Sequence, residues 1–127
     1  MRSGWEIACY KDADGLVPVI EYIFDGKNET DLAVMIAVIQ RLSRVGLKLI
    51  DTDMAKHIEG PIFELRKDRH RIMFADDTTK GRFVLLSAFA KETHKTPPEK
   101  IEEAQANWED YLRTERCDVF RVPVDDF

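Results

Sequence analysis

The sequence Ile62-Phe63-Glu64-Leu65-Arg66 opens the part of the chain that decides its fold. Its residues alternate in character, so that Phe63 and Leu65 fall on one face of a strand and their neighbours on the other. Two more strand-like runs follow after polar turns, Arg71-Ile72-Met73-Phe74-Ala75 and Arg82–Phe89. Because short turns join neighbouring antiparallel strands, we expect a three-stranded meander over residues 62–89.

N-terminal to this meander, the pattern predicts a strand and then a short helix. The stretch Trp5–Tyr10 is aromatic and β-branched enough for a strand. Pro18 can open a helix, because its missing N–H has no partner in a first turn, and Gly26 stops that helix.

A longer helix follows and completes a helical hairpin. Asn28 or Thr30 can cap its start, and Gly46 ends it. After this glycine the periodicity is poor, which predicts a loop over residues 47–59. The apolar stripe that faces the sheet consists of Leu32, Met35, Ile36, Ile39, Leu42 and Val45.

C-terminal to the meander, the pattern changes to a helical period. Thr96-Pro97-Pro98-Glu99 predicts a capping box, in which the threonine hydroxyl accepts a hydrogen bond from the N3 amide. Residues 116–127 are predicted to form a tail. Between the capping box and this tail lies the helix, whose apolar positions are Ile101, Ala104, Trp108, Tyr111 and Leu112.

The composition indicates one soluble globular domain. The chain has 127 residues, 44% hydrophobic and 34% charged, a size that can bury about two thirds of its unfolded surface. Its longest apolar run, Leu32–Ile39, is much shorter than the roughly 20 residues of a membrane span. Because the N-terminus lacks the apolar core of a signal peptide, we expect a cytoplasmic protein in which Cys9 and Cys117 are free thiols.

Charge is distributed unevenly along the chain. The net charge is -5, from 19 Lys+Arg against 24 Asp+Glu. Residues 56–95 hold 9 basic and 6 acidic side chains, whereas residues 1–55 hold 6 and 9, and residues 96–127 hold 4 and 9. A basic middle within an acidic protein predicts either a surface that attracts phosphate or a solvated surface of mixed charge.

The candidate functional residues are cations of this basic middle. Arg66 and Arg71 flank a short turn and can lie within about 10 Å of each other, and Lys91 and Lys95 follow the third strand. Guanidinium groups hold nonbridging phosphate oxygens and ammonium groups stabilise developing charge, which suits phosphodiester chemistry. The alternative is that the arginines form surface pairs with nearby carboxylates such as Glu64.

The three histidines, His57, His70 and His94, share no spacing typical of metal ligands, and we predict neither a metal nor a cofactor. His70 reads as a turn residue. His94 lies between two lysines and can act as an acid or a base, because an unperturbed imidazole has a pKa of about 6.5.

Several motifs occur in a familiar order. They are Ile62–Arg66, the strand that begins Arg71-Ile72, the aliphatic strand Phe83–Leu86, and Phe89-Ala90-Lys91-Glu92-Thr93-His94-Lys95-Thr96-Pro97 before Lys100-Ile101-Glu102-Glu103-Ala104. This order resembles the RelE/ParE toxin superfamily, and specifically its phage-derived, HigB-like branch. The resemblance covers about residues 5–113 and leaves 114–127 as the C-terminal tail of a single domain, 1–127. It implies an α+β, RelE-like fold, with an N-terminal helical hairpin packed on a small curved antiparallel sheet and a C-terminal helix.

The resemblance also implies an activity and partners. Members of this branch are toxins of type II toxin-antitoxin systems that cleave mRNA, often on the ribosome. A protein antitoxin neutralises them, usually a helix-turn-helix protein through which the complex binds operator DNA. The reaction would be a metal-free attack of a ribose 2′-hydroxyl that gives a 2′,3′-cyclic phosphate. By position the catalytic residues would be Arg66, Arg71 and Lys91, and the residues binding RNA phosphates Lys95, His94, Lys56 and His57.

Two departures from the branch favour other functions of the same fold. Glu92 stands where the branch usually has lysine, and the chain is acidic whereas ribosome-acting members are generally basic. Glu92 favours a phage protein of the same fold that binds a host protein, and the acidic charge disfavours action on the ribosome. The further alternative is a non-enzymatic toxin of the same fold that binds a host protein such as DNA gyrase. The combination of Arg66, Arg71 and Lys91 favours the nuclease.

Overall fold

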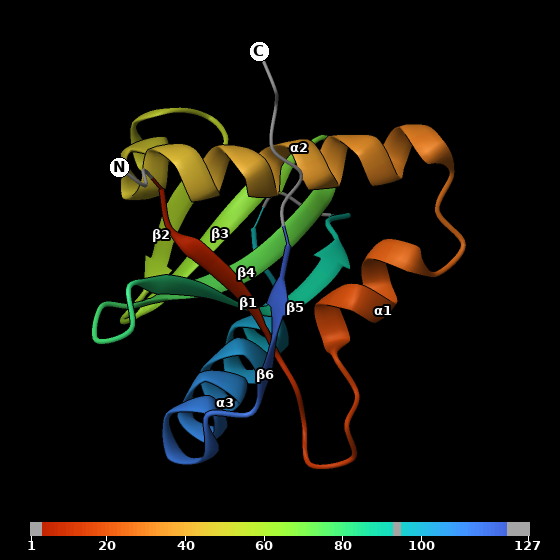
Figure 1. Cartoon of the computed structure of the whole chain (residues 1–127). Helices are drawn as coiled ribbons and strands as arrows, with labels where there is room; N and C mark the ends of the chain where they lie inside the picture. The colour runs from red at the N-terminus through yellow and green to blue at the C-terminus, as the bar shows by residue number, and fades with distance from the viewer. Residues whose placement is uncertain (1–3, 93–94, 122–127) are drawn as a thin grey trace.

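Ten elements of secondary structure occur in the computed structural model, which describes residues 4–92 and 95–121. Figure 1 shows a twisted sheet with one long helix on each side, so the predicted α+β fold is confirmed. In chain order the elements are β1 (Glu6–Tyr10), α1 (Pro18–Phe24), α2 (Glu29–Val45), the 3-10 helix η1 (Gly46–Asp51), β2 (Ala55–Glu59), β3 (Ile62–Lys67), β4 (His70–Asp77), β5 (Arg82–Ala90), α3 (Pro98–Thr114) and β6 (Cys117–Phe120).

The strands form a single sheet in the order β2-β3-β4-β5-β1-β6. Strands β2 to β5 are an antiparallel meander, which confirms the three predicted strands and adds a fourth. Strand β1 lies parallel to β5, and β6 pairs antiparallel with β1. The sheet therefore brings the first and last strands of the described chain side by side, as Figure 1 shows.

Two segments differ from their prediction. The predicted loop at 47–59 holds η1 and β2, and the predicted tail holds β6. Strand β2 buries only Ala55, and β6 buries none of its residues. Both are edge strands that form through backbone hydrogen bonds to one neighbour, so they carry no alternating apolar pattern. The rest of the predicted tail, residues 122–127, lies outside the described residues.

The ends of α2 follow the predicted local signals. Asn28 caps the helix by accepting a hydrogen bond from the backbone N–H of Asp31 at 2.8 Å. The N–H of Gly46 donates to the Leu42 carbonyl at the other end. Gly46 has a φ of +68°, and a Cβ there would lie 2.7 Å from the Trp5 ring, so this position requires glycine.

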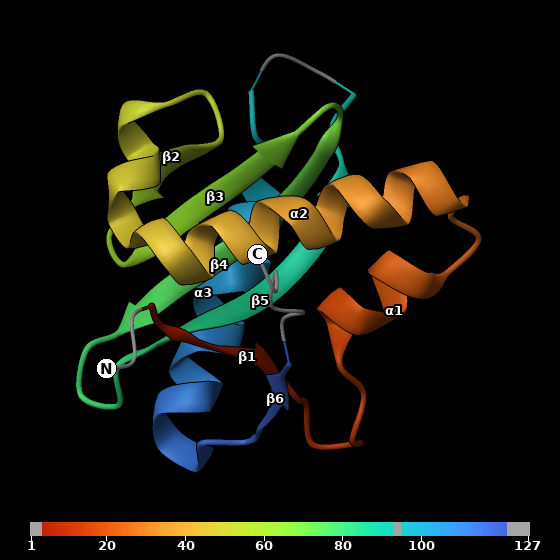
Figure 2. The same cartoon turned by 45° about the horizontal axis from the view of Figure 1, so that its top comes forward.

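Each face of the sheet has its own apolar core. Helices α1 and α2 cover one face, where Ile39 packs with Phe74. Helix α3 covers the other face, where Tyr111 packs with Met73. Figure 2 shows α2 and α3 on opposite sides of the sheet. Because the middle of β4 is buried on both faces, the charged side chains of this strand lie at its ends.

The start of α3 differs from the predicted capping box. Its N-cap is Pro97, and no side chain caps the helix. The hydroxyl of Thr96 instead donates to Oε2 of Glu64 at 2.6 Å. In a capping box this hydroxyl would accept from a backbone N–H, whereas here it donates to a carboxylate, which is a strong acceptor, and this bond ties Thr96 to the sheet.

The structure also tests the predictions on the cysteines. Cys9 and Cys117 are free thiols, as predicted. Burial raises the pKa of the Cys9 thiol to about 12, so this cysteine is an unreactive packing residue. Within residues 4–92 and 95–121, no helix has the length and apolar character needed to cross a membrane.

Candidate active site

Arg66 and Arg71 lie directly opposite each other at the end of the β3–β4 hairpin. Their neighbours Leu65 and Ile72 belong to the core under α1 and α2, so by strand alternation both arginines are on the other face, toward α3. The predicted proximity of the two arginines is therefore confirmed. Two like charges opposite each other repel, so this arrangement requires a compensating group.

Glu64 is that compensating group. Its side chain is fully buried, and its Oε1 accepts a hydrogen bond from Nε of Arg66 at 3.1 Å and lies 3.7 Å from Nε of Arg71. Its Oε2 accepts the hydrogen bond from Thr96. The alternative that the arginines pair with a carboxylate is thus correct for Glu64, but the pair lies on a buried carboxylate and not on the surface.

Arg71 is fixed by the turn that precedes it. Its Nη1 donates to the carbonyl of Asp68 at 2.7 Å and to that of His70 at 2.9 Å. Its Nε is buried without a hydrogen bond. Burial lowers the pKa of the Arg71 guanidinium, and Glu64 opposes this shift while Arg66 adds to it. The guanidinium is therefore held by two backbone carbonyls, while its Nε has no hydrogen-bond partner among the residues that the structure describes.

Lys91 brings a third positive charge to the same place. It follows β5, and its backbone N–H donates to the Arg69 carbonyl at 2.7 Å, which ties it to the β3–β4 turn. Partial burial lowers the pKa of the Lys91 ammonium, the charge of Glu64 opposes this shift, and the charges of Arg71, Arg66 and Lys56 add to it. Lys91 therefore belongs to one electrostatic cluster with the two arginines.

A cavity of about 280 Å³ is bordered by Arg66 and Lys91 of this cluster, whereas Arg71 lies beside it and is not among its lining residues. Lys56 borders it from β2, where it pairs with Glu64 in the strand register. Lys95 is exposed and borders the cavity just before α3. The described residues that line it are Lys56, His57, Ile58, Arg66, Lys91, Lys95, Thr96 and Ile101. Four of these side chains are lysine or arginine, so the cavity suits an anion.

The histidines differ from one another in their relation to this cavity. His57 borders it, but its ring contacts the Gly60 carbonyl at 2.8 Å and packs against Phe63, whose side chain belongs to the opposite face. His94 lies outside the described residues. Among the residues that the structure describes, no group of His, Cys, Asp and Glu side chains is arranged to hold a metal ion.

The prediction that His70 is a turn residue is wrong. His70 is the first residue of β4 and is only 4% exposed. Its Nδ1 lies 2.8 Å from the Tyr22 hydroxyl, and its Nε2 lies 3.3 Å from Asp31. His70 therefore ties α1 and the start of α2 to the sheet, on the face opposite the cations. These contacts enclose its side chain.

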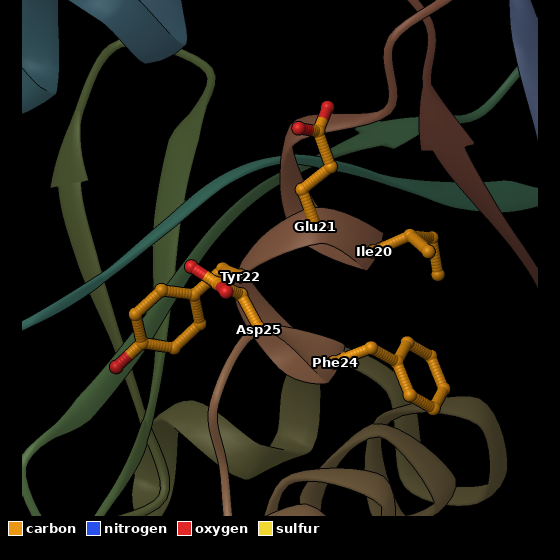
Figure 3. A pocket seen from close by; sticks show the side chains of 5 residues that line it. All are labelled: Ile20, Glu21, Tyr22, Phe24 and Asp25. Carbon is orange, nitrogen blue, oxygen red and sulfur yellow. The ribbon is translucent and has the colours of Figure 1, made fainter.

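A second cavity, of about 600 Å³, lies against α1. Figure 3 shows that Ile20 and Phe24 leave the helix on one side while Tyr22 leaves it on the other. The lining includes the carboxylates of Glu21 and Asp25 and no lysine or arginine. This cavity is therefore unsuited to a phosphate, and the cation cluster is the better candidate for phosphate chemistry.

Reasoning from the sequence gives two residues of the site another place: Glu64 is expected only as a surface partner of the arginines, and Thr96 only as a helix cap. The alternation of β3 places Glu64 on the same face as Arg66, which was a usable signal for the first of them. The local pattern at Thr96 predicts a capping box. Its true partner is 32 residues away along the chain, and no local pattern records that distance.

Comparison with known families assigns the chain to a family. Residues 23–109, more than half of the chain, match the model of the family described as phage derived protein Gp49-like. The chain belongs to this Gp49-like family. The Gp49-like family is part of the RelE/ParE-like toxin superfamily, so the predicted superfamily is confirmed and the phage-derived character with it. A search of curated proteins gave no significant match.

The matched residues include every described residue that lines the cavity. The Gp49-like region begins in α1, contains the β2–β5 meander and ends within α3. It therefore includes Arg66, Arg71 and Lys91 together with Glu64. Strands β1 and β6, which extend the sheet on the far side of β5, lie outside the matched region.

Proposed function

We propose that this Gp49-like protein is the toxin of a toxin-antitoxin system, in the HigB-like branch, and that it is an endoribonuclease that cleaves mRNA. The observation that supports this proposal is the cluster of Arg66, Arg71 and Lys91 around a buried carboxylate, beside a cavity with further lysines. An RNA strand presents a phosphate at every nucleotide, and such a cluster binds phosphate through charge-assisted hydrogen bonds.

The proposed reaction uses the RNA's own nucleophile. The ribose 2′-oxygen attacks the adjacent phosphorus and loses its proton, the P–O5′ bond breaks, and the 5′-oxygen gains a proton. The products are a 2′,3′-cyclic phosphate and a 5′-hydroxyl. Arg66 and Arg71 stabilise the additional negative charge on the nonbridging oxygens in the transition state.

Among the residues that the structure describes, Lys91 is the one we propose to transfer a proton. A general acid works best when its pKa is close to the working pH, and the pKa of Lys91 is lowered toward that range by partial burial and by the neighbouring positive charges. Lys56 and Lys95 contact the phosphates on either side. His94, which lies outside the described residues, and His57 are assigned to binding the strand.

The proposed partner is a protein antitoxin that binds DNA through a helix-turn-helix domain, so that the complex contacts operator DNA only through the antitoxin. The proposed substrate is mRNA, including mRNA on the ribosome. A same-fold protein that binds a host protein such as DNA gyrase is the second candidate, and the acidic net charge of -5 favours it.

Induced expression in bacteria separates these candidates. We expect growth arrest and new 5′ ends on a reporter mRNA, detected by primer extension, and we expect Arg66→Ala and Lys91→Ala to abolish both. Arg41→Ala and Lys48→Ala are the matched controls, since both residues are exposed and lie on α2 and η1, away from the cavity. Arrest without new 5′ ends would reject the nuclease and support a protein target.

A further inference from the structure

Glu64 is a charged residue in a place where an apolar residue would be expected. Its side chain has 0% exposure, and its register neighbour on β4 is the buried Met73. Taking a carboxylate out of water costs several kcal/mol, and a well-packed apolar residue often serves stability as well or better. The position of Glu64 therefore calls for an explanation beyond stability of the sheet.

The contacts of Glu64 reach three different segments of the site. Oε1 contacts Arg66 within its own strand and Arg71 across the hairpin, and Oε2 contacts Thr96 just before the start of α3. Both arginines are contacted at Nε, which lies on the stem side of the guanidinium. The contact with Glu64 does not use the terminal nitrogens of Arg66, which are the ones that can meet phosphate oxygens end-on.

We propose that Glu64 is the positioning residue of this site: it sets the orientation of the Arg66 and Arg71 guanidinium groups toward the reacting phosphate and fastens the segment at Thr96 beside them. This inference rests on the proposed nuclease function. Glu64 does not touch the RNA, and it acts through the two arginines. Its carboxylate also reduces the repulsion that would drive the two arginines apart.

The test uses Glu64→Gln, which keeps the shape of the side chain and removes its charge. Single-turnover cleavage of a reporter mRNA in a translation system, at increasing protein concentration, gives a maximal rate and a half-saturating concentration. We expect the maximal rate to fall roughly 10- to 100-fold, the effect of misplacing a group by about 1 Å. We expect the half-saturating concentration not to rise, because the cluster becomes more positive.

Two further variants complete the design. Glu92→Gln removes a charge from an exposed residue next to Lys91 and should leave both parameters within about twofold of the wild type. Thr96→Val removes only the hydroxyl that donates to Glu64 and should lower the maximal rate about fivefold, the effect of one hydrogen bond. Circular dichroism establishes that each variant is folded, and if Glu64→Gln does not fold, the threonine variant decides.

The inference is overturned if folded Glu64→Gln keeps the wild-type maximal rate, or if Glu92→Gln lowers it equally. A wild-type protein that cleaves no mRNA refutes the proposed function. In that case the positioning role is read from the side-chain Nε–Hε signal of Arg66 in ¹H–¹⁵N spectra. This signal should move in Glu64→Gln and stay in Glu92→Gln, and an unmoved signal overturns the inference.

Discussion

The cation cluster predicts how strongly RNA binding depends on salt. Four lysine and arginine side chains line the cavity, and the carboxylate of Glu64 offsets one of them. About three phosphates are then neutralised on binding. For a single strand the slope of log K against log salt is about −0.7 per phosphate contact, which gives about −2. Affinity should fall about 20-fold between roughly 50 and 200 mM salt.

Fluorescence anisotropy with a labelled 2′-O-methyl RNA measures this slope without cleavage, because the nucleophilic hydroxyl is blocked. Lys56→Met removes one cation from the cavity and should make the slope shallower by about 0.7. Lys48→Met removes the same charge from η1, outside the cavity, and should leave the slope unchanged.

Two results would refute the reasoning. A wild-type slope near zero would mean that the cavity does not take up phosphates, whatever the chemistry of its lining. Equal slopes for Lys56→Met and Lys48→Met would mean that RNA binds through diffuse charge on the whole surface and not through the cavity.

Three further predictions concern stability and protonation. Tyr111→Phe should lower the free energy of unfolding, measured in urea, by about 2 kcal/mol or more. The reason is that the buried Tyr111 hydroxyl donates to Asp77 at 2.5 Å, and the carboxylate would lose this donor. A change under about 0.5 kcal/mol would contradict this prediction. Gly46→Ala should destabilise by at least about 1 kcal/mol, seen as a lower Tm, because of its positive φ and the close Trp5 ring; an unchanged Tm would be contrary. RNA affinity should fall as pH rises toward the lowered pKa of Lys91, because the amine loses its charge. The Lys91→Arg variant should stay charged and keep a constant RNA affinity over the same pH range. If the affinities of the two proteins, measured by anisotropy, change in parallel with pH, Lys91 does not contact the phosphate.

The fold could be predicted where local signals and burial coincide. Helix α2 has a cap at Asn28, a stripe that includes Met35 and Ile39, and a stop at Gly46, and all of these act as predicted. The meander could be predicted for the same reason, since its strands alternate or are continuously apolar and its turns are polar. Edge strands β2 and β6 could not be predicted, because they depend on backbone pairing with a neighbour.

The site could be predicted only as far as hairpin geometry extends. A short turn between Arg66 and Arg71 requires that the two arginines lie close together. The burial of Glu64 could not be predicted, because it depends on how α3 and the segment at Thr96 cover the sheet. For the same reason the local pattern predicts a turn at His70, although contacts from α1 and α2 enclose this residue.

The two ends of the sheet provide an internal comparison that separates structural charges from functional ones. At one end, Arg82 donates to Glu6 and to the Tyr111 hydroxyl, which in turn donates to Asp77, so that positive charge is matched by carboxylates. At the other end, the single carboxylate of Glu64 is shared by two arginines, and further lysines border the same cavity. Charges arranged only for stability would be paired, as at the first end. The excess positive charge at the second end would be stabilised by a bound anion, and this difference supports the proposal that the functional site lies at the β3–β4 turn.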